Sequence, residues 1–130
     1  MNLEKVGSEV LFALKQECKV LGITLKWSKD CEPGNWGKCN FKYRNNKATI
    51  TINAELDSFL AAFTLAHEIG HFFQHLNRKN FANMEEIEED ADQYFFKAIR
   101  RYVDKELYGE LNSYVYNLTG KRLIKDAVTT

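Results

Sequence analysis

The chain has 130 residues, of which 45% are hydrophobic and 28% charged, and its eighteen basic side chains balance eighteen acidic ones. This composition is typical of a globular protein and not of a disordered or low-complexity chain. A protein that binds nucleic acid through its own charge normally has a basic excess, so the zero net charge argues against direct DNA or RNA binding.

Length, cysteine use and hydropathy predict a single intracellular domain. We expect one domain over residues 1–130, in which residues 119–130 form a tail. The first residues do not read as a signal peptide, and the longest apolar run, 59–66, is far shorter than the ~20 residues that span a bilayer. These features predict a cytoplasmic protein without a membrane segment. The three cysteines fit no metal or disulfide pattern and are expected to be free thiols: Cys18, Cys31 and Cys39.

The first third of the chain predicts a helix followed by a strand. Apolar residues recur at helical spacing over residues 2–21, and Gly22 is suited to the left-handed position after a helix. The next stretch, ITLKW, alternates apolar and polar residues as a half-buried strand does. Residues 28–37, SKDCEPGNWG, hold the only proline and are expected to form a loop.

A hairpin is predicted around Asn45-Asn46, since asparagines tolerate the positive φ values of a two-residue turn. The register counted outward from this turn sets apolar residues opposite one another: Tyr43 and Ala48, Phe41 and Ile50, Cys39 and Ile52. Together with the earlier strand, this pairing predicts a small antiparallel three-stranded sheet.

The second half of the chain is expected to be helical. Residues 56–76 are apolar around most of a helix, which predicts a central, buried position. Asn83 and Glu86 stand in capping-box positions for another helix, predicted to run to about Leu107. A last short helix is expected over residues 109–118.

The three histidines of the chain lie in one stretch of the central helix, FTLAHEIGHFFQH. His67 and His71 are four residues apart and therefore lie on the same helical face, so both can direct a ring nitrogen at one ion. Glu68 flanks this pair, where it can take a proton from a water activated by the metal. Such a site needs a third protein ligand.

The acidic run EEIEEDAD supplies candidates for this ligand. Most of its acids fall on the polar face of their helix, but Glu88 and Asp92 fall on the apolar line of Ala91 and Phe95. Buried carboxylates require a cationic or hydrogen-bonding partner. We therefore predict Glu88 as the third zinc ligand and Asp92 as an acceptor from a ligating histidine. Glu85 and Glu89 remain alternatives for the ligand.

His75 shares the four-residue spacing but not the geometry of a ligand. On a straight helix it lies ~80° around and ~12 Å along the axis from His67. It is expected at the edge of a cleft or in a hydrogen bond, and only as a less favoured alternative on the metal. The donor that stabilises an oxyanion is left open, with a tyrosine as one candidate.

The chain resembles the ImmA/IrrE family of small zinc metallopeptidases, within the gluzincin class. The resemblance covers about residues 20–99 and rests on a sheet ending in ITIN, on FTLAHEIGHFFQH, and on ExxAD followed by Tyr94-Phe95. It implies a zincin-like α+β fold with an N-terminal helix, a small sheet, a central HExxH helix and C-terminal helices. It also implies zinc bound by His67, His71 and Glu88, with Glu68 as the catalytic acid and base.

The resemblance further implies a cytoplasmic endopeptidase that cuts a helix-turn-helix transcriptional repressor of a phage, mobile element or stress response. Family members commonly continue into a leucine-rich segment ending in proline, whereas this chain reads FFKAIRRYVDKELYG. Two other readings stay open: a non-catalytic zinc protein that sequesters a repressor or toxin, and a minimal gluzincin with an unrelated substrate. A latency switch in which Cys31 or Cys39 occupies the zinc site is a further, weaker alternative.

Overall fold

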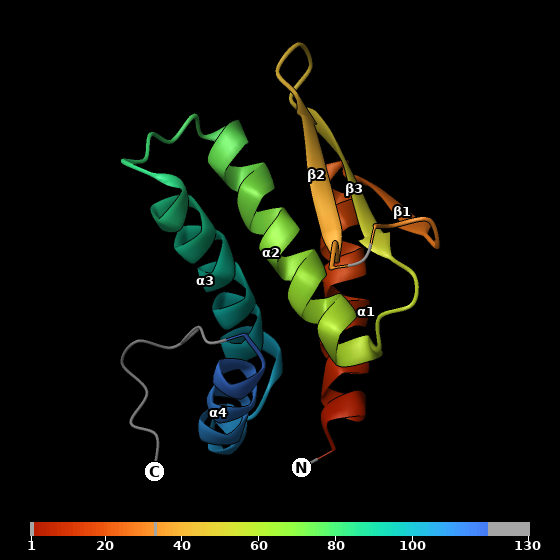
Figure 1. Ribbon diagram of the computed structural model, residues 1–130, viewed down its shortest axis with the longest axis vertical. Coiled ribbons are helices and arrows are strands. Elements are labelled where there is room, and N and C mark those ends of the chain that lie inside the picture. Colours follow the sequence, from red (N-terminus) through yellow and green to blue (C-terminus); the bar gives the residue numbers. More distant parts are fainter. Residues whose placement is uncertain (1, 33, 120–130) are drawn as a thin grey trace.

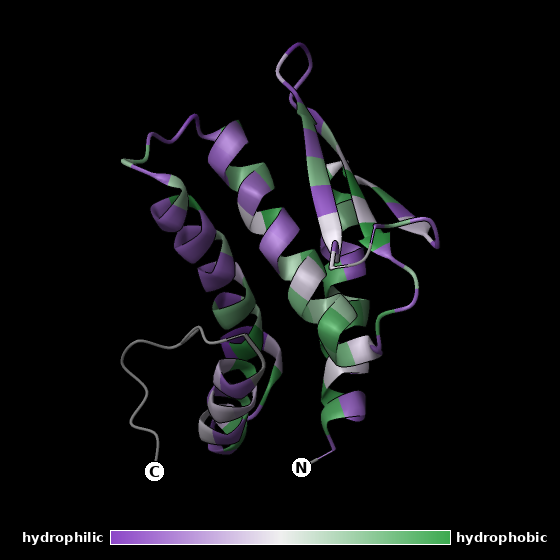
Figure 2. Cartoon of the chain, viewed as in Figure 1, coloured by the Kyte–Doolittle hydropathy of each residue, from purple (hydrophilic) through white to green (hydrophobic). Residues whose placement is uncertain are grey.

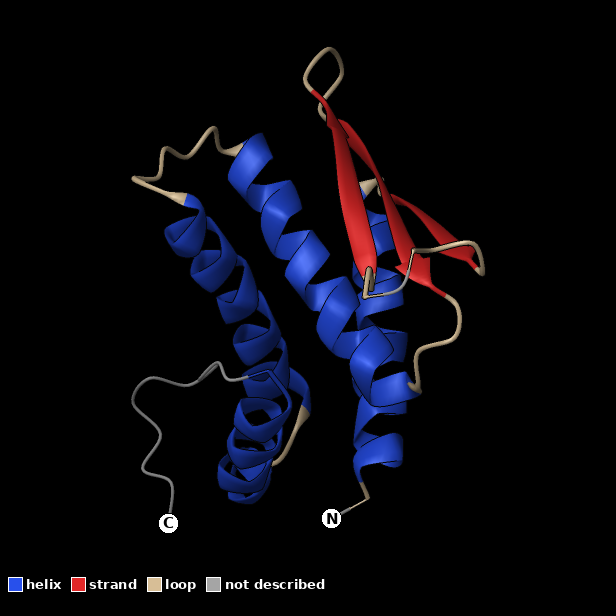
Figure 3. Ribbon diagram, in the orientation of Figure 1, coloured by secondary structure: helices blue, strands red, loops and turns tan. Residues whose placement is uncertain are grey.

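The computed structural model describes residues 2–32 and 34–119, and its central element is helix α2 (Figure 1). The three strands lie on one side of α2, and α3 and α4 lie on the other (Figure 3). The elements in chain order are α1 (Leu3–Leu21), β1 (Thr24–Ser28), β2 (Gly37–Lys42), β3 (Lys47–Asn53), α2 (Ser58–Leu76), α3 (Met84–Tyr102), a 3-10 turn (Lys105–Leu107) and α4 (Tyr108–Thr119). The α+β class and the N-terminal helix are therefore confirmed. The predicted tail lies, from residue 120 onward, outside the described residues.

The helices begin and end at residues that satisfy their terminal backbone groups. Asn2 accepts a hydrogen bond from the Lys5 amide at the start of α1, and Gly22 ends this helix in the left-handed region with a φ of 73°. Asp57 caps α2 through the Leu60 amide at 2.8 Å. Such caps replace the intrahelical partners that the first amides of a helix lack. Helix α2 consequently begins two residues later than predicted.

Helix α3 has the predicted start but not the predicted end. The Asn83 side chain accepts from the Glu86 amide at 3.0 Å, while the Glu86 carboxylate accepts from Ala82 instead of from Asn83. The helix was expected to reach Leu107, but it ends at Tyr102 because Val103 is extended, with φ −124° and ψ 143°. A separate helix, α4, then follows where the last short helix was predicted.

The sheet is mixed, so the prediction of an antiparallel sheet throughout is wrong. The strand order is β1-β3-β2, with β2 antiparallel to β3 and β1 parallel to it. β1 and β2 run in opposite directions, and β3 lies between them. The loop that joins β1 to β2 passes the end of β3. There the Asn53 amide donates to the Trp36 carbonyl at 2.8 Å, and the Ala54 amide donates to the Ser28 carbonyl at 2.8 Å.

The hairpin of β2 and β3 is shifted by two residues from the predicted register. Cys39 pairs with Ile50 and Phe41 with Ala48, because residues 43–46 form a four-residue turn in place of the predicted two-residue one. Within this turn Asn46 has a φ of 56°, and the Asn45 side chain accepts from the Lys47 amide at 3.2 Å. A shift of two keeps each side chain on its predicted face.

The core surrounds α2, which packs against α1, α3 and the sheet. Figure 2 shows apolar colouring along the first half of α2 and polar colouring at the start of α3. Fully buried side chains from each layer meet here, among them Leu14, Ile50, Ile52, Leu65, Ile69, Phe72 and Phe95. Gly70 lies so close to Ala91 that a Cβ on it would come within 2.7 Å of the Ala91 carbonyl oxygen. α2 and α3 thus approach backbone to backbone at this point. Among the described helices, none is long and apolar enough to cross a membrane.

Candidate metal centre

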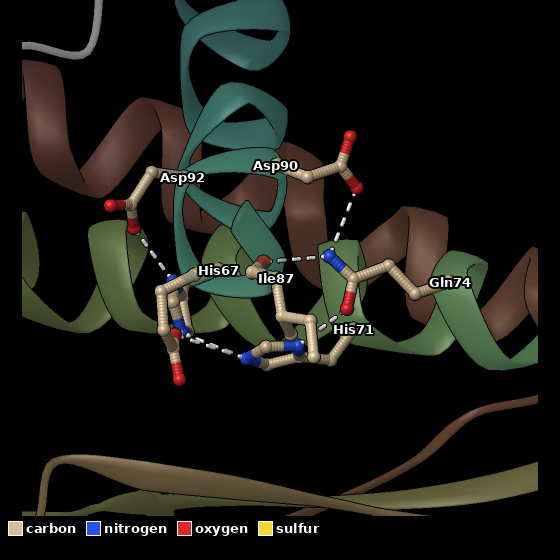
Figure 4. Close-up of polar contacts among 7 residues, drawn as sticks. His67, His71, Gln74, Ile87, Asp90 and Asp92 are labelled. Atoms are coloured by element: carbon tan, nitrogen blue, oxygen red, sulfur yellow. Dashed lines mark hydrogen bonds and ion pairs between the residues drawn. The ribbon is translucent and has the colours of Figure 1, made fainter. Parts of the chain in front are cut away.

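The side chains of His67, His71 and Glu88 converge where α2 and α3 pack together, and Figure 4 labels the two histidines. The Nε2 atoms of His67 and His71 lie 3.0 Å apart, as expected for residues one turn apart on α2. An oxygen of Glu88, from α3, lies 2.8 Å from the first of these nitrogens and 3.4 Å from the second. The three donor atoms fall within 4.8 Å of one another, so one ion can contact all of them.

Asp92 orients His67 from one turn further along α3 than Glu88. Its Oδ1 lies 2.7 Å from Nδ1 of His67, and its side chain is buried. The carboxylate accepts the Nδ1 proton, which leaves the Nε2 lone pair directed at the cluster. Burial lowers the pKa of His67, but the hydrogen bond and charge of Asp92, joined by nearby glutamates, outweigh burial and raise this pKa overall.

His71 is oriented in the same sense by a neutral group. Its Nδ1 lies 2.8 Å from Oε1 of Gln74, one turn further along α2. The amide oxygen accepts the Nδ1 proton, so Nε2 of His71 also directs a lone pair at the cluster. Two imidazole lone pairs and a carboxylate oxygen therefore face one another, and such a set of acceptors is favourable around a cation. The chemistry of these donors fits zinc, which takes imidazole and carboxylate ligands.

A cleft of about 430 Å³ opens beside this cluster and gives access to Glu68. The cleft is bounded by the loop before β2, by the middle of α2 and by α3. Its lining residues include Trp36, Gly37, Phe63, Thr64, His67, Glu68 and Glu88. Glu68 is only 6% exposed. Burial raises the pKa of its carboxyl group, an effect that the neighbouring His67 and His71 oppose. A carboxyl group held in this way is suited to exchange a proton with a molecule in the cleft.

His75 lies apart from the cluster, on the side of α2 that meets the hairpin turn. Its ring stacks on Phe41 at 5.4 Å, and its Nδ1 shares a short hydrogen bond with the Tyr43 hydroxyl. Arg78 lies over the Tyr43 ring and donates to Asn46 at 3.2 Å. His75 thus helps to fasten the tip of the hairpin to the end of α2, and it is absent from the lining of the cleft.

The remaining candidates do not belong to the donor cluster. Glu85 and Glu89 are exposed, and neither belongs to the group of donors found among the described residues. No cysteine belongs to this group either, although Cys39 lies near enough to Glu68 for its charge to affect the thiol. Burial and then this charge raise the pKa of Cys39 to about 12, which makes it unreactive. None of the tyrosines that were candidates for the oxyanion lines the cleft.

Sequence reasoning assigned no role to Gln74, although the structure places it in contact with His71. The sequence could have indicated this role, because Gln74 is a polar residue on a strongly apolar helix, one turn after a predicted ligand. Gln74 is 6% exposed, and a buried amide needs hydrogen-bond partners. The same reasoning that singled out Glu88 and Asp92 applies to it.

Comparison with known proteins is consistent with this geometry. The family model of the IrrE N-terminal-like domain, Peptidase M78, matches residues 18–107, well over half of the chain. This stretch contains every residue of the cluster and of the cleft around it. Neither curated proteins nor solved structures give a match. From the extent of the family match, the chain belongs to the family of IrrE N-terminal-like peptidase domains.

Proposed function

We propose that this protein is a zinc-dependent endopeptidase. The observation that carries the proposal is the convergence of His67, His71 and Glu88 beside a cleft whose lining includes Glu68. Membership of a peptidase family supports a metallopeptidase-type activity. Zinc as the metal, and cleavage within a protein chain, are the finer parts of the proposal.

Zinc would be held by Nε2 of both histidines and by the carboxylate of Glu88, with Asp92 fixing the ring of His67. When bound, it supplies a Lewis acid that polarises the scissile carbonyl and lowers the pKa of water. Only three protein donors converge in the described part of the chain, so a coordination position is left for water or substrate.

Glu68 acts as the general base and then as the general acid. Its carboxylate takes a proton from the attacking water and delivers it to the nitrogen of the leaving amine. Because burial raises its pKa, the Glu68 carboxylate takes up this proton more readily than an exposed carboxylate would. The apolar rings of Trp36 and Phe63 line the same cleft and reduce the exposure of Glu68 to water.

An extended substrate segment is expected to lie along β2, an outer strand of the sheet whose first residue, Gly37, lines the cleft. Such a segment would add itself to the free edge as a further strand. In the absence of a tyrosine in the lining, the side-chain N–H groups of Asn35 and Trp36 are the donors we assign to the developing oxyanion.

We place the substrate among helix-turn-helix transcriptional repressors and the protein in the cytoplasm. The support for both is the resemblance of FTLAHEIGHFFQH and ExxAD to the ImmA/IrrE motif. The balanced charge of the chain agrees with a protein that binds a repressor and not its DNA.

The test measures metal content and cleavage on the same purified protein. Stoichiometric zinc is expected in the wild type and in Glu68→Gln, whereas Glu88→Ala should lose most of it. Glu68→Gln should abolish cleavage of a repressor encoded beside the gene, as read by intact mass. The exposed Glu9, on α1 and away from the cleft, provides the control Glu9→Gln, which should cleave as the wild type does.

The outcomes separate the alternatives. Stoichiometric zinc without cleavage of the repressor or of a peptide library would identify a binding protein. Cleavage of library peptides but not of the repressor would keep the peptidase and discard this substrate. Cleavage that survives in Glu68→Gln would remove Glu68 from the mechanism.

A further inference from the structure

A buried amide lies behind the candidate metal site, in contact with both helices that supply the ligands. Gln74, on α2, makes three hydrogen bonds: its Oε1 to Nδ1 of His71 at 2.8 Å, and its Nε2 to the Ile87 carbonyl oxygen at 2.8 Å and to Oδ2 of Asp90 at 2.9 Å (Figure 4). Both contacts of the nitrogen are to groups on α3. The inference below rests on the proposed metal function of the same site.

The partners of this amide fix its orientation. The Ile87 carbonyl and the Asp90 carboxylate can only accept, so the end of the amide that faces them must be the NH₂ group. The oxygen then faces His71, and it can only accept. Nδ1 of His71 must therefore carry the proton, which leaves Nε2 as the atom with a free lone pair.

The same side chain also fixes the distance between the two ligand-bearing helices. Ile87 is the residue before Glu88, so the carbonyl that Gln74 holds is next to the third ligand. One turn away, the close contact of Gly70 and Ala91 sets the separation of the backbones. The hydrogen bonds of Gln74 and the contact of Gly70 with Ala91 thus join α2 to α3 at two successive helical turns.

We propose that Gln74 is a positioning residue of the metal site. It selects the tautomer of His71 that can bind a metal through Nε2, and it holds the start of α3 so that Glu88 meets both histidines. Its role parallels that of Asp92 on His67, but Gln74 is neutral and lies on the same helix as the histidine that it orients, while its nitrogen is bonded to α3. Loss of a group that orients a metal ligand typically lowers metal affinity by ~10–100-fold.

The decisive variant is Gln74→Met, which keeps the length of the side chain and removes its hydrogen bonds. Zinc affinity, measured by competition with a chromogenic chelator, should fall by ~10–100-fold. The matched control is Gln16→Met on the exposed surface of α1, which should bind zinc as the wild type does. Thermal unfolding of the metal-free proteins checks that each variant is folded.

A second measurement reports on His71 directly. In metal-free wild type at about pH 8, above the usual titration range of histidine, nitrogen NMR should show His71 protonated at Nδ1. In Gln74→Met the His71 signals should shift toward the Nε2-protonated form, while those of His67 keep their wild-type tautomer. A merely structural role for Gln74 predicts no such selective change.

A charge-matched pair of substitutions covers the case in which Gln74→Met does not fold. Gln74→Glu keeps an acceptor for His71 but sets a carboxylate against Asp90, so zinc affinity should fall. Adding Asp90→Asn restores a donor to this contact and should recover part of the lost affinity. Failure of this rescue would overturn the part of the proposal that concerns Asp90.

Wild-type zinc affinity and an unchanged His71 tautomer in folded Gln74→Met would overturn the proposal. This result is distinct from failure of the proposed function, in which the wild type itself would bind no stoichiometric zinc. In that case the tautomer of His71 in the metal-free protein still decides whether Gln74 orients it.

Discussion

Substituting alanine for Gly70 should separate the two ligand-bearing helices. The new Cβ would lie 2.7 Å from the Ala91 carbonyl oxygen, about 0.7 Å short of the 3.4 Å at which ordinary van der Waals contact begins. The obstacle is backbone, which cannot turn aside as a side chain can. Overpacking of this kind costs ~1–3 kcal/mol, and the better helix propensity of alanine returns ~1 kcal/mol. We expect a net loss of about 1 kcal/mol, or a Tm lower by about 4 °C.

The effect of Gly70→Ala on metal binding should exceed its effect on stability. In the metal-free variant the two helices can move apart and relieve the clash. Binding an ion requires Glu88 to return to both histidines, which restores the clash in the bound state. Zinc affinity should therefore fall about tenfold, the equivalent of ~1.4 kcal/mol. Both quantities can be measured, by calorimetry of the metal-free protein and by chelator competition.

Gly7→Ala is the matched control for this substitution. Its Cβ would lie 2.5 Å from the backbone of Phe59, at the packing of α1 on α2 and away from the cluster. It should destabilise the protein at least as much but leave zinc affinity unchanged. If Gly70→Ala binds zinc as tightly as the wild type does, the helix contact does not set the geometry of the site.

Three further substitutions probe other contacts. His75→Phe should keep the stack on Phe41 and leave zinc content unchanged, since His75 lies outside the cluster. Because burial lowers the pKa of His75, the folded state favours its neutral form; this stabilisation is present above about pH 6.5 and is lost as the pH falls. The advantage of wild type over His75→Phe in urea unfolding should therefore shrink from pH 7.5 to pH 5, and a constant difference would contradict the assignment. Glu17→Ala removes the acceptor of the Tyr94 hydroxyl at 2.6 Å and should cost ~1–3 kcal/mol without changing zinc affinity. Gly109→Ala, with open space around its Cβ, should be neutral or stabilise by up to ~1 kcal/mol in thermal unfolding; a loss of stability would contradict this.

The helices and the cluster could be predicted because local chemistry determines them. Asn83 and Gly22 mark helix ends through their own side chain or backbone freedom. Glu88 and Asp92 stood out as acids on an apolar helical line, and the structure brings both to the histidines. Their roles as ligand and orienting group remain predictions until metal is measured.

What could not be predicted depends on contacts between distant segments. The hairpin was displaced by two residues because strand periodicity is the same in either register, and only the turn chooses between them. The insertion of β3 between β1 and β2 depends on how the sheet packs on α2, which alternation of apolar residues does not encode. The predicted continuation of α3 failed because Val103 and Leu107 keep helical spacing although the chain turns between them.

The donor atoms of the cluster come from two helices that are joined by an exposed connection over residues 77–83. An ion held between them would therefore be a cross-link as well as a catalyst, and its binding energy would add to the folding energy of the whole chain. At a free concentration one hundred times the Kd, this linkage contributes ~2.7 kcal/mol. The lifetime of the protein against degradation would then follow the supply of metal, so that scarcity removes the enzyme itself and not only its activity.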